Sequence, residues 1–377
     1  MESLPTELLQ IIIESAYYRK GIPDRPFLQT CALVCQAWSG PARRLLFRHV
    51  ELHHFLRRVY ISFSMAIDPT SERGRRLGQH VRILEITIGL KSTNVVVDDL
   101  ADLLERTPRL YELVLRIRGV HQFDTNTIQR LTHLATHSTV EGSSPLRVRA
   151  LTILSCGIQS PIVYQLLKIW PSVEFLYIGV ELAAPPPKWS PAFHLYQLTL
   201  MRTPRQSILS WLLSSSTESL QIVSFRDAPG RDFDSILDTI GPRLRSLRLM
   251  NYSLRAAAVL MKCTRLEEFV ILQLSTLFAL DDLPPTIKHL KCRNMPSEDQ
   301  SIGSVIHAIG RLPRLRVVTC ATQASADERF PDLRNLCASR SIELILDELS
   351  LWMQREDPVY VDQFPRTKSI ANFALMN

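Results

Sequence analysis

Glycine is scarce in this chain, and the glycine-rich motifs of many enzymes are missing from it. Only 13 of the 377 residues are glycine, against 23 prolines. The sequence has no Gly-Lys-Ser/Thr phosphate loop, no Gly-x-Ser-x-Gly turn of the hydrolases and no dinucleotide-binding glycine fingerprint. These absences leave no recognisable catalytic site. An enzyme would need a catalytic site assembled from residues that lie far apart in the sequence, and this is the least favoured class of function.

Long apolar runs and a strong charge of one sign are lacking as well. The run Leu8–Ile13 is too short for a signal sequence or a membrane span, and no basic-then-apolar leader follows Met1. The 44 basic and 37 acidic residues give a net charge of +7, which is mild for this length and does not favour nucleic-acid binding. We expect a soluble protein whose partner is neither a nucleic acid nor a membrane.

Cysteine is present in an odd number, seven, and the cysteines lie in apolar segments. Buried, reduced thiols explain this pattern and indicate a cytoplasmic or nuclear protein. Cys31 and Cys35 lack a second pair of metal ligands. His133 and His137 lack the glutamate that accompanies such a pair in a metalloprotease helix. We therefore predict no metal and no cofactor.

Three short helices are expected within residues 1–52. Pro5 and Glu7 suit a helix N-terminus, and apolar residues recur at helical spacing from Leu8 to Ala16. A second helical stretch covers residues 28–38, and Gly40-Pro41 is expected to interrupt the chain before a third at 42–47. A core this small favours burial of part of its apolar surface against a partner.

Two half-motifs in this segment resemble the F-box. The opening Leu-Pro-x-Glu-Leu-Leu-x-x-Ile of that family is matched by Leu4-Pro-Thr-Glu-Leu-Leu-Gln-Ile-Ile12. Its second half, in the form common in fungal F-box proteins, is similar to Cys31-Ala-Leu-Val-Cys-Gln-Ala-Trp38 followed by Pro41-Ala-Arg-Arg-Leu-Leu-Phe47. The resemblance covers about 50 of the 377 residues.

The resemblance implies a module that docks on the Skp-type adaptor of a cullin–RING ubiquitin ligase. On the matching positions it assigns the adaptor contact to Leu4, Pro5, Leu8, Ile12, Val34 and Trp38. For Trp38 an interface position and a core position fit the pattern equally, because a groove-binding helix and a core helix carry the same apolar stripe. The internal core is expected to contain Leu9, Ile13, Leu33 and Cys35.

A linker helix (53–80), a repeat array (81–350) and a C-terminal cap or tail (351–377) are expected after the module. The array is indicated by a recurring triplet of apolar residues, of which Leu244-Arg-Ser-Leu-Arg-Leu249 is the clearest copy. Successive copies start 21–29 residues apart, with one spacing of 38. They begin at Val81, Leu110, Val148, Val173, Leu195, Leu220, Leu244, Leu266, Ile287, Leu315 and Ile342.

The period and the segments between the copies resemble irregular leucine-rich repeats. Helical apolar spacing is found at 101–106, 162–169, 208–213, 236–240, 256–261 and 302–309. One strand and one helix cannot bury their own apolar faces, so the units must stack. The predicted fold is α/β: a three-helix F-box module followed by a leucine-rich-repeat solenoid with parallel strands on its concave face. Few copies carry the Asn or Cys that the family shows after the third apolar position.

Residues between the apolar positions of each strand are expected on the concave face, where a partner would bind. Candidate target contacts are an aromatic anchor and four basic residues toward the C-terminal half: Tyr177, Arg226, Arg248, Lys291 and Arg293. The basic residues would favour an acidic or phosphorylated ligand, and ordinary solvated charges explain them equally well. Two insertions, Thr136–Arg147 and Leu182–Pro191, are predicted to be loops.

Together these patterns favour a non-catalytic substrate-recognition subunit of an SCF-type ubiquitin ligase. It would bind the Skp-type adaptor through its N-terminal helices and an unknown protein target through the repeat face. The alternative is a repeat scaffold for protein–protein interaction, outside any ligase, whose N-terminal helices only cap the array.

Overall fold

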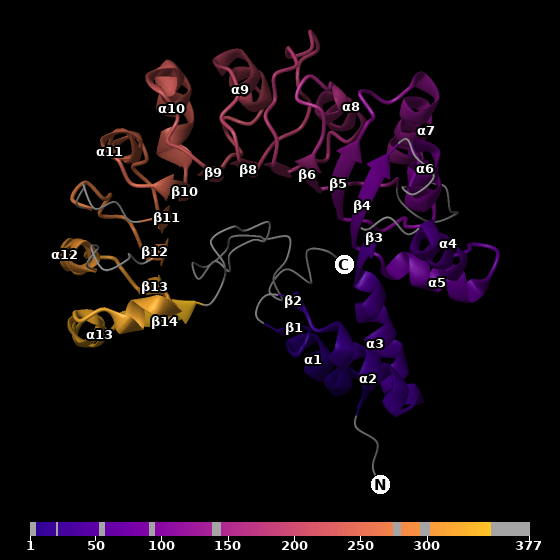
Figure 1. Ribbon diagram of the computed structural model, residues 1–377, viewed down its shortest axis with the longest axis horizontal. Helices are drawn as coiled ribbons and strands as arrows, with labels where there is room; N and C mark the ends of the chain where they lie inside the picture. The colour runs from indigo at the N-terminus through magenta and orange to yellow at the C-terminus, as the bar shows by residue number, and fades with distance from the viewer. Residues whose placement is uncertain are drawn as a thin grey trace. The chain divides into compact units, whose positions relative to one another are not determined.

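The chain has an α/β fold that divides into two compact units at Pro187–Lys188 (Figure 1). This division falls inside the proline-containing insertion Leu182–Pro191. The computed structural model describes residues 5–19, 22–52, 57–89, 95–137, 145–273, 280–294 and 302–347. The expected C-terminal cap, 351–377, lies outside these residues.

The first unit starts with helices and a short antiparallel hairpin and continues as a parallel sheet. Its helices are α1 (Thr6–Ser15), α2 (Arg25–Val34), α3 (Gln36–Arg48), α4 (Arg57–Ala66), α5 (Glu72–His80), α6 (Val97–Glu105), α7 (Thr125–Thr136) and α8 (Ile162–Ile169). The hairpin consists of β1 (Tyr18–Arg19) and β2 (Ile22–Pro23). The parallel strands follow in the order β3 (His49–Leu52), β4 (Ile83–Gly89), β5 (Glu112–Arg118), β6 (Ala150–Ser155) and β7 (Phe175–Ile178).

The second unit repeats a strand and a return segment, which in most repeats includes a helix. Its parallel strands are β8 (Gln197–Leu200), β9 (Ile222–Phe225), β10 (Ser246–Asn251), β11 (Glu268–Gln273), β12 (His289–Asn294), β13 (Val317–Ala321) and β14 (Glu343–Asp347). Its helices are α9 (Gln206–Leu213), α10 (Asp234–Ile240), α11 (Leu254–Met261), α12 (Gly303–Arg311) and α13 (Phe330–Ser339). Short 3₁₀ turns are η1 (Arg231–Phe233), η2 (Gly241–Arg243) and η3 (Thr322–Ala326).

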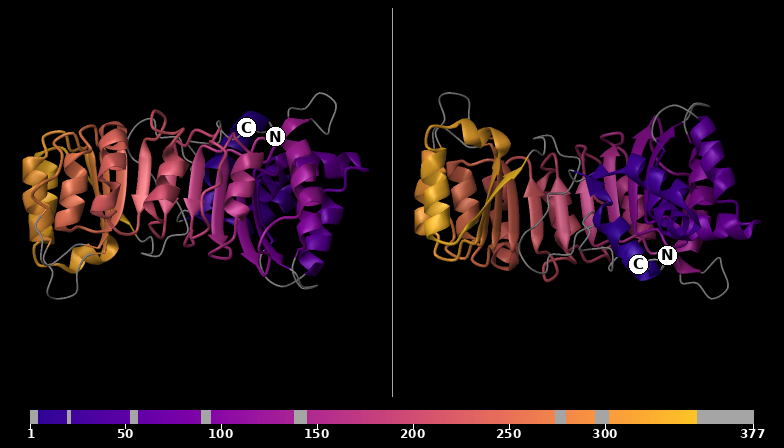
Figure 2. Two further views of the ribbon diagram at one scale, coloured as in Figure 1. Left: turned by 90° about the horizontal axis from the view of Figure 1, so that it is seen from above. Right: turned by 90° about the horizontal axis from the view of Figure 1, so that it is seen from below.

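Within each unit the helices α6–α8 and α9–α13 lie on one face of the strands, and Figure 2 shows helices and strands stacked side by side. The apolar triplet of each repeat fills the space between these layers. In β10, Leu247 and Leu249 are fully buried, and Leu244 is buried just before the strand. Because the strands pair in parallel, Leu247 lies beside Val223 of β9 and Phe269 of β11, so successive triplets form one continuous core.

The repeat prediction is confirmed strand by strand. Ten of the eleven copies are followed by a strand that begins two residues after the first apolar position, and the last copy by a strand that begins one residue after it. The intervening helical segments are confirmed as parts of α6, α8, α9, α10, α11 and α12. The sequence did not predict β3, which pairs in parallel with β4 directly after the N-terminal helices.

The helix boundaries within residues 28–47 were predicted wrongly. The expected second helix ends early, because Cys35 adopts an extended backbone (φ −165°, ψ 175°). Helix α3 then runs through Pro41 without interruption. Proline removes one backbone donor there, but the preceding Gly40 has no Cβ to clash with the proline ring.

The proline-containing insertion is anchored at its C-terminal end by aromatic packing. Trp189 meets Trp211 of α9 edge to face, with ring centroids 4.8 Å apart. The indole Nε1 of Trp211 donates a hydrogen bond to the carbonyl of Trp189 at 2.9 Å. This part of the insertion is therefore packed against the second unit and is not a free loop.

We predict that Leu247→Ala lowers the free energy of unfolding by about 2–5 kcal/mol, because it opens a cavity in the continuous core. Urea denaturation followed by circular dichroism measures the change. The matched control is Leu254→Ala at an exposed position of α11 (72% exposed), which should change stability by less than about 0.5 kcal/mol. Equal effects of the two substitutions would contradict the assignment of Leu247 to the core.

Candidate functional sites

The N-terminal helices have a complete internal core of their own. Leu9 and Ile13 of α1, Tyr17, Leu28 of α2 and Leu45 of α3 are buried together. Phe27, Trp38 and Leu46 pack against this cluster. The core positions predicted for Leu9 and Ile13 are confirmed. Trp38 is half-buried against the same cluster, so its ring contributes to the core of the module.

The same helices also expose large apolar side chains, which we call the apolar set: Leu8, Ile11, Ile12, Leu33 and Val34. Their exposed fractions range from 48% for Ile12 to 86% for Leu33. On α1 they follow helical spacing on the side turned away from Leu9 and Ile13. Exposed apolar side chains grouped on one small module are typical of a protein–protein contact.

The six predicted adaptor contacts differ in how far their side chains are exposed. Leu8, Ile12 and Val34 belong to the apolar set, and Pro5 is exposed at the N-cap of α1. Leu4 lies outside the described residues. The core positions expected for Leu33 and Cys35 are wrong, since both side chains are exposed. Helix α2 ends between them, so the helical phase that would have turned them inward is lost.

Two of the five candidate target contacts, Arg248 and Lys291, are buried rather than presented to solvent. Arg248 is 9% exposed and Lys291 1%. Both lie on the strand face opposite the helices. In the parallel register, Val270 of β11 stands between them. The sequence led us to expect that both side chains would be accessible, and they are not. Their role in target binding stays a prediction.

The burial of Arg248 is balanced by a polar network centred on Glu268. One carboxylate oxygen, Oε1, accepts hydrogen bonds from the Ser246 hydroxyl and from Arg248 Nη2, the latter at 2.9 Å. The other, Oε2, lies 3.0 Å from His289 Nδ1, which must donate because an ionised carboxylate only accepts. The Nε2 atom of His289 contacts the Thr319 hydroxyl at 3.0 Å. Four neighbouring strands are linked in this way.

The remaining candidate target contacts are more accessible. Tyr177 in β7 and Arg226 just after β9 are both half-buried. Arg293 lies in β12, and its side chain is outside the described part of the structure. Tyr177 belongs to the first unit and Arg226 to the second.

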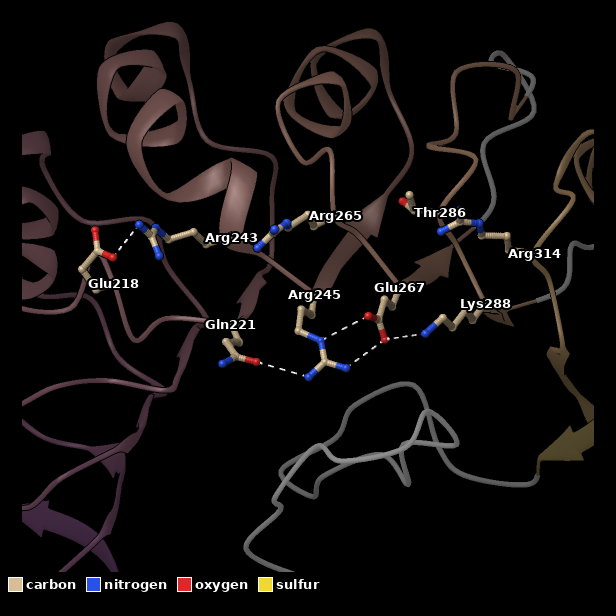
Figure 3. Close-up of a pocket in the computed structure, with 9 residues that line it drawn as sticks. All are labelled: Glu218, Gln221, Arg243, Arg245, Arg265, Glu267, Thr286, Lys288 and Arg314. Atoms are coloured by element: carbon tan, nitrogen blue, oxygen red, sulfur yellow. Dashed lines mark hydrogen bonds and ion pairs between the residues drawn. The ribbon is translucent and has the colours of Figure 1, made fainter.

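A pocket that we had not predicted lies at the N-terminal ends of the strands in the second unit (Figure 3). We call it the basic pocket; its volume is about 410 Å³. Its lining residues are Glu218, Gln221, Arg243, Arg245, Arg265, Glu267, Thr286, Lys288 and Arg314. Five positive and two negative side chains give it an excess of three positive charges at neutral pH.

The inner part of the basic pocket is a ladder of paired side chains from equivalent positions of successive repeats. Arg245 binds Glu267 through two parallel contacts, Nη2 to Oε2 at 2.9 Å and Nε to Oε1 at 3.3 Å. Lys288 Nζ lies 3.3 Å from the same Oε2, and Arg245 also reaches Gln221 at 3.4 Å. Burial alone would raise the pKa of Glu267, but the hydrogen bonds and charges of Arg245 and Lys288 lower it.

The outer part of the pocket is less neutralised. Arg243 pairs with Glu218 at 2.5 Å, and the Thr286 hydroxyl donates to the Leu266 carbonyl. Arg265 and Arg314 are exposed and have no acidic partner among the described residues. Figure 3 shows the guanidinium of Arg314 extending toward Thr286 and that of Arg265 extending toward Arg243.

A sequence signal for this pocket existed and was overlooked. The first apolar residue of several repeats is flanked by charged residues, as in Arg243-Leu-Arg245, Arg265-Leu-Glu267 and Arg314-Leu-Arg316. Stacking the repeats brings these flanking positions into line. The predicted target contacts instead lie within a strand or directly after one.

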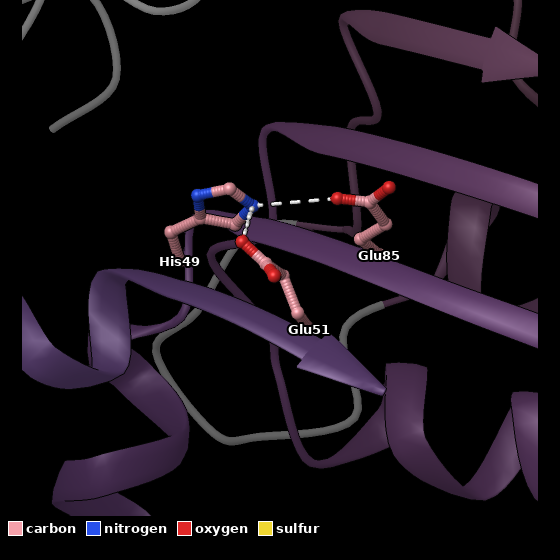
Figure 4. A group of neighbouring side chains, drawn as sticks. All are labelled: His49, Glu51 and Glu85. Atoms are coloured by element: carbon pink, nitrogen blue, oxygen red, sulfur yellow. Dashed lines mark ion pairs between the residues drawn. The ribbon is translucent and has the colours of Figure 1, made fainter. Parts of the chain in front are cut away.

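His49, Glu51 and Glu85 on β3 and β4 bring potential metal ligands within 4.8 Å of one another (Figure 4). His49 Nε2 lies 3.6 Å from Glu51 and 3.8 Å from Glu85. Each carboxylate already has an arginine partner, Arg25 for Glu51 at 3.0 Å and Arg116 for Glu85 at 2.6 Å. The carboxylate charges are thus balanced without an ion, and the cluster is accounted for as an ion-pair network.

Comparison with models of known families finds no match to the chain, and no curated protein matches its sequence. None of the helices in the described ranges combines the length and the apolar character that crossing a bilayer requires.

We predict that Glu268→Gln destabilises the protein at pH 7 by about 3–5 kcal/mol, because it leaves Arg248 buried without its counter-charge. Burial alone would raise the pKa of Glu268, but Arg248, His289 and Ser246 lower it from 4.5 to about 2. A carboxyl with a lowered pKa stabilises the folded state fully above its unfolded pKa and loses this contribution as the pH falls.

The stability gap between wild type and Glu268→Gln should therefore narrow between pH 4.5 and about 2, as urea titrations at a series of pH values would measure. Glu343→Gln, at an exposed position of β14 in the same sheet, is the control and should alter stability little. A gap that stays constant down to pH 2 would show that the ionised carboxylate does not hold the network.

We also predict that one thiol reacts much faster than the others. Cys35 is exposed, whereas the other six are buried or half-buried. Burial raises the pKa of half-buried Cys156 to about 11, so its reactive thiolate is scarce. Brief treatment with N-ethylmaleimide, read by mass spectrometry, should label one site, and Cys35→Ser but not Cys156→Ser should abolish the labelling.

Proposed function

We propose that this protein is a non-catalytic substrate-recognition subunit of an SCF-type ubiquitin ligase. Its N-terminal helices would bind the Skp-type adaptor, and its strand–helix repeats, read as a leucine-rich-repeat solenoid, would bind a protein target. The observation that carries the proposal is the apolar set. Those residues remain exposed although the module already has a complete core, so burial in that core does not explain them.

The chemistry of the apolar set fits an apolar surface on a protein partner. Leu8, Ile11 and Ile12 lie within about one turn of one another on α1, and Leu33 and Val34 end α2. Aliphatic side chains of this kind bind by removing apolar surface from water, at roughly 25 cal/mol per Å². Three of the positions that the F-box resemblance assigns to the adaptor, Leu8, Ile12 and Val34, are among them.

The repeats supply a surface for the target, and the accessible candidates on it are Tyr177 and Arg226. Arg248 and Lys291 are buried, so they are not accessible to a target in this structure. The protein would act by holding the target near the ubiquitin-charged enzyme and would contribute no catalytic group. Burial raises the pKa of Cys263 and Cys320 to about 12, which disfavours a nucleophilic thiolate at either position.

One observation favours the alternative, a repeat scaffold without ligase involvement. Helix α3 leads into β3, the edge strand that pairs with β4, and Arg25 of α2 forms an ion pair with Glu51 of β3 at 3.0 Å. The N-terminal helices are thus joined to the first strand, as a terminal cap of a repeat array would be. Capping accounts for this junction but not for the exposure of the apolar set.

We predict that the full-length chain retains a Skp-type adaptor in co-purification and that Leu8→Glu/Ile12→Glu abolishes retention. A buried interface anchor contributes about 2 kcal/mol or more, so loss of two should weaken binding by roughly two orders of magnitude or more. Exposed positions are preferable to Trp38, whose replacement would also damage the core of the module.

The control is Leu254→Glu, at a leucine on α11 of the second unit that is more exposed than Leu8 or Ile12. It should leave adaptor binding unchanged, and circular dichroism should show both variants folded. No retention of the adaptor by the wild type, or equal retention by Leu8→Glu/Ile12→Glu, would reject the ligase function and leave the scaffold.

A further inference from the structure

The basic pocket presents two positive side chains that no described acidic residue neutralises. Other arginines of the second unit do have such partners: Arg255 pairs with Asp234, Arg311 with Asp281 and Arg329 with Asp332. Arg265 and Arg314 line the pocket without one within the described ranges. Two of the three excess positive charges in the lining therefore lie in its outer part, on Arg265 and Arg314.

The spacing of these two arginines is set by the repeat. Arg265 precedes β11, Thr286 precedes β12 and Arg314 precedes β13 by the same number of residues, three. Adjacent strands lie about 4.8 Å apart, so the backbones of Arg265 and Arg314 are separated by two such steps, roughly 10 Å. Thr286 stands between them, and its short side chain leaves the space open (Figure 3).

The inner ladder forms the base of the pocket, and its charged side chains pair with one another. Glu267 pairs with both Arg245 and Lys288, since it binds the first at two points and the second at 3.3 Å, and one positive charge of the ladder stays in excess. It is thus held away from the outer arginines and does not compete with an incoming anion. Guanidinium groups bind phosphoryl oxygens through paired, charge-assisted hydrogen bonds.

We propose that the basic pocket binds a small oligophosphate, an anion with at least two phosphoryl groups, through Arg265 and Arg314. Arg243, one repeat earlier, lines the same pocket, and its charge is balanced by Glu218. The volume of about 410 Å³ falls within the range of roughly 300–1,000 Å³ usual for small-molecule sites. A folded protein partner would instead need a contact of about 800 Å² on each side.

This site lies entirely in the second unit and does not depend on the N-terminal helices or on adaptor binding. The alternative is that Arg265 and Arg314 are ordinary solvated surface residues. They would then attract any anion weakly, and no better than other pairs of exposed arginines. For a specific site, the affinity for an anion depends on Arg265 and Arg314 and rises with the number of phosphoryl groups. For two solvated arginines it depends on neither. Both differences can be measured.

The test is calorimetric titration of the full-length protein with inorganic tripolyphosphate at about 0.15 M salt, where exposed charges are screened over roughly 8 Å. We expect binding to the wild type and at least tenfold weaker binding to Arg265→Gln/Arg314→Gln, since each lost charge-assisted contact is worth about one order of magnitude. Inorganic monophosphate, which can engage only one arginine at a time, should bind at least tenfold more weakly than tripolyphosphate.

The matched control is Arg202→Gln/Arg205→Gln, which removes two exposed arginines from the same unit outside the pocket. It has the same net charge as the pocket variant and should keep wild-type affinity. Thermal melting checks that both variants fold. Three results would overturn the proposal: no tripolyphosphate binding by the wild type, equal weakening by the two double variants, or binding of a doubly phosphorylated peptide without binding of tripolyphosphate.

Discussion

Parallel stacking of small strand–helix units is the constraint on which the rest of the structure depends. One unit cannot bury its apolar triplet, so Leu247 requires Val223 on one side and Phe269 on the other. The register that joins these core residues also aligns every other position of the repeat. Whatever residue type occurs at one position in a repeat is placed beside the residue at the same position in the next.

Alternation of charge between neighbouring repeats follows from this alignment. Arg245, Glu267 and Lys288 occupy one position, and Ser246, Glu268 and His289 occupy the next. An acidic residue stands between basic or polar ones in both rows, because like charges at about 4.8 Å would repel. Where the alternation lapses, at Arg265 and Arg314 across Thr286, the surface becomes positively charged.

The apolar triplets were sufficient to predict the strands, because burial of three leucine-like residues at a fixed spacing has few other solutions. β3 was missed because residues 49–52 carry no such triplet and join the sheet through pairing with β4. The exposure of Leu33 was missed because the end of a helix depends on a single backbone rotation at Cys35. The burial of Arg248 depends on Glu268, twenty residues away, which becomes its neighbour only when the register between repeats is known.

The two rows also restrict how the array can change length. Removing the repeat that contains Glu267 and Glu268 would leave the leucine triplets in step but would bring Arg245 beside Lys288 and the buried Arg248 beside Lys291. Its neighbours would lose the carboxylates of Glu267 and Glu268, and with them a counter-charge in each row at once. This repeat is therefore not interchangeable with the others, and insertion or loss of units is easier at places where the rows are neutral.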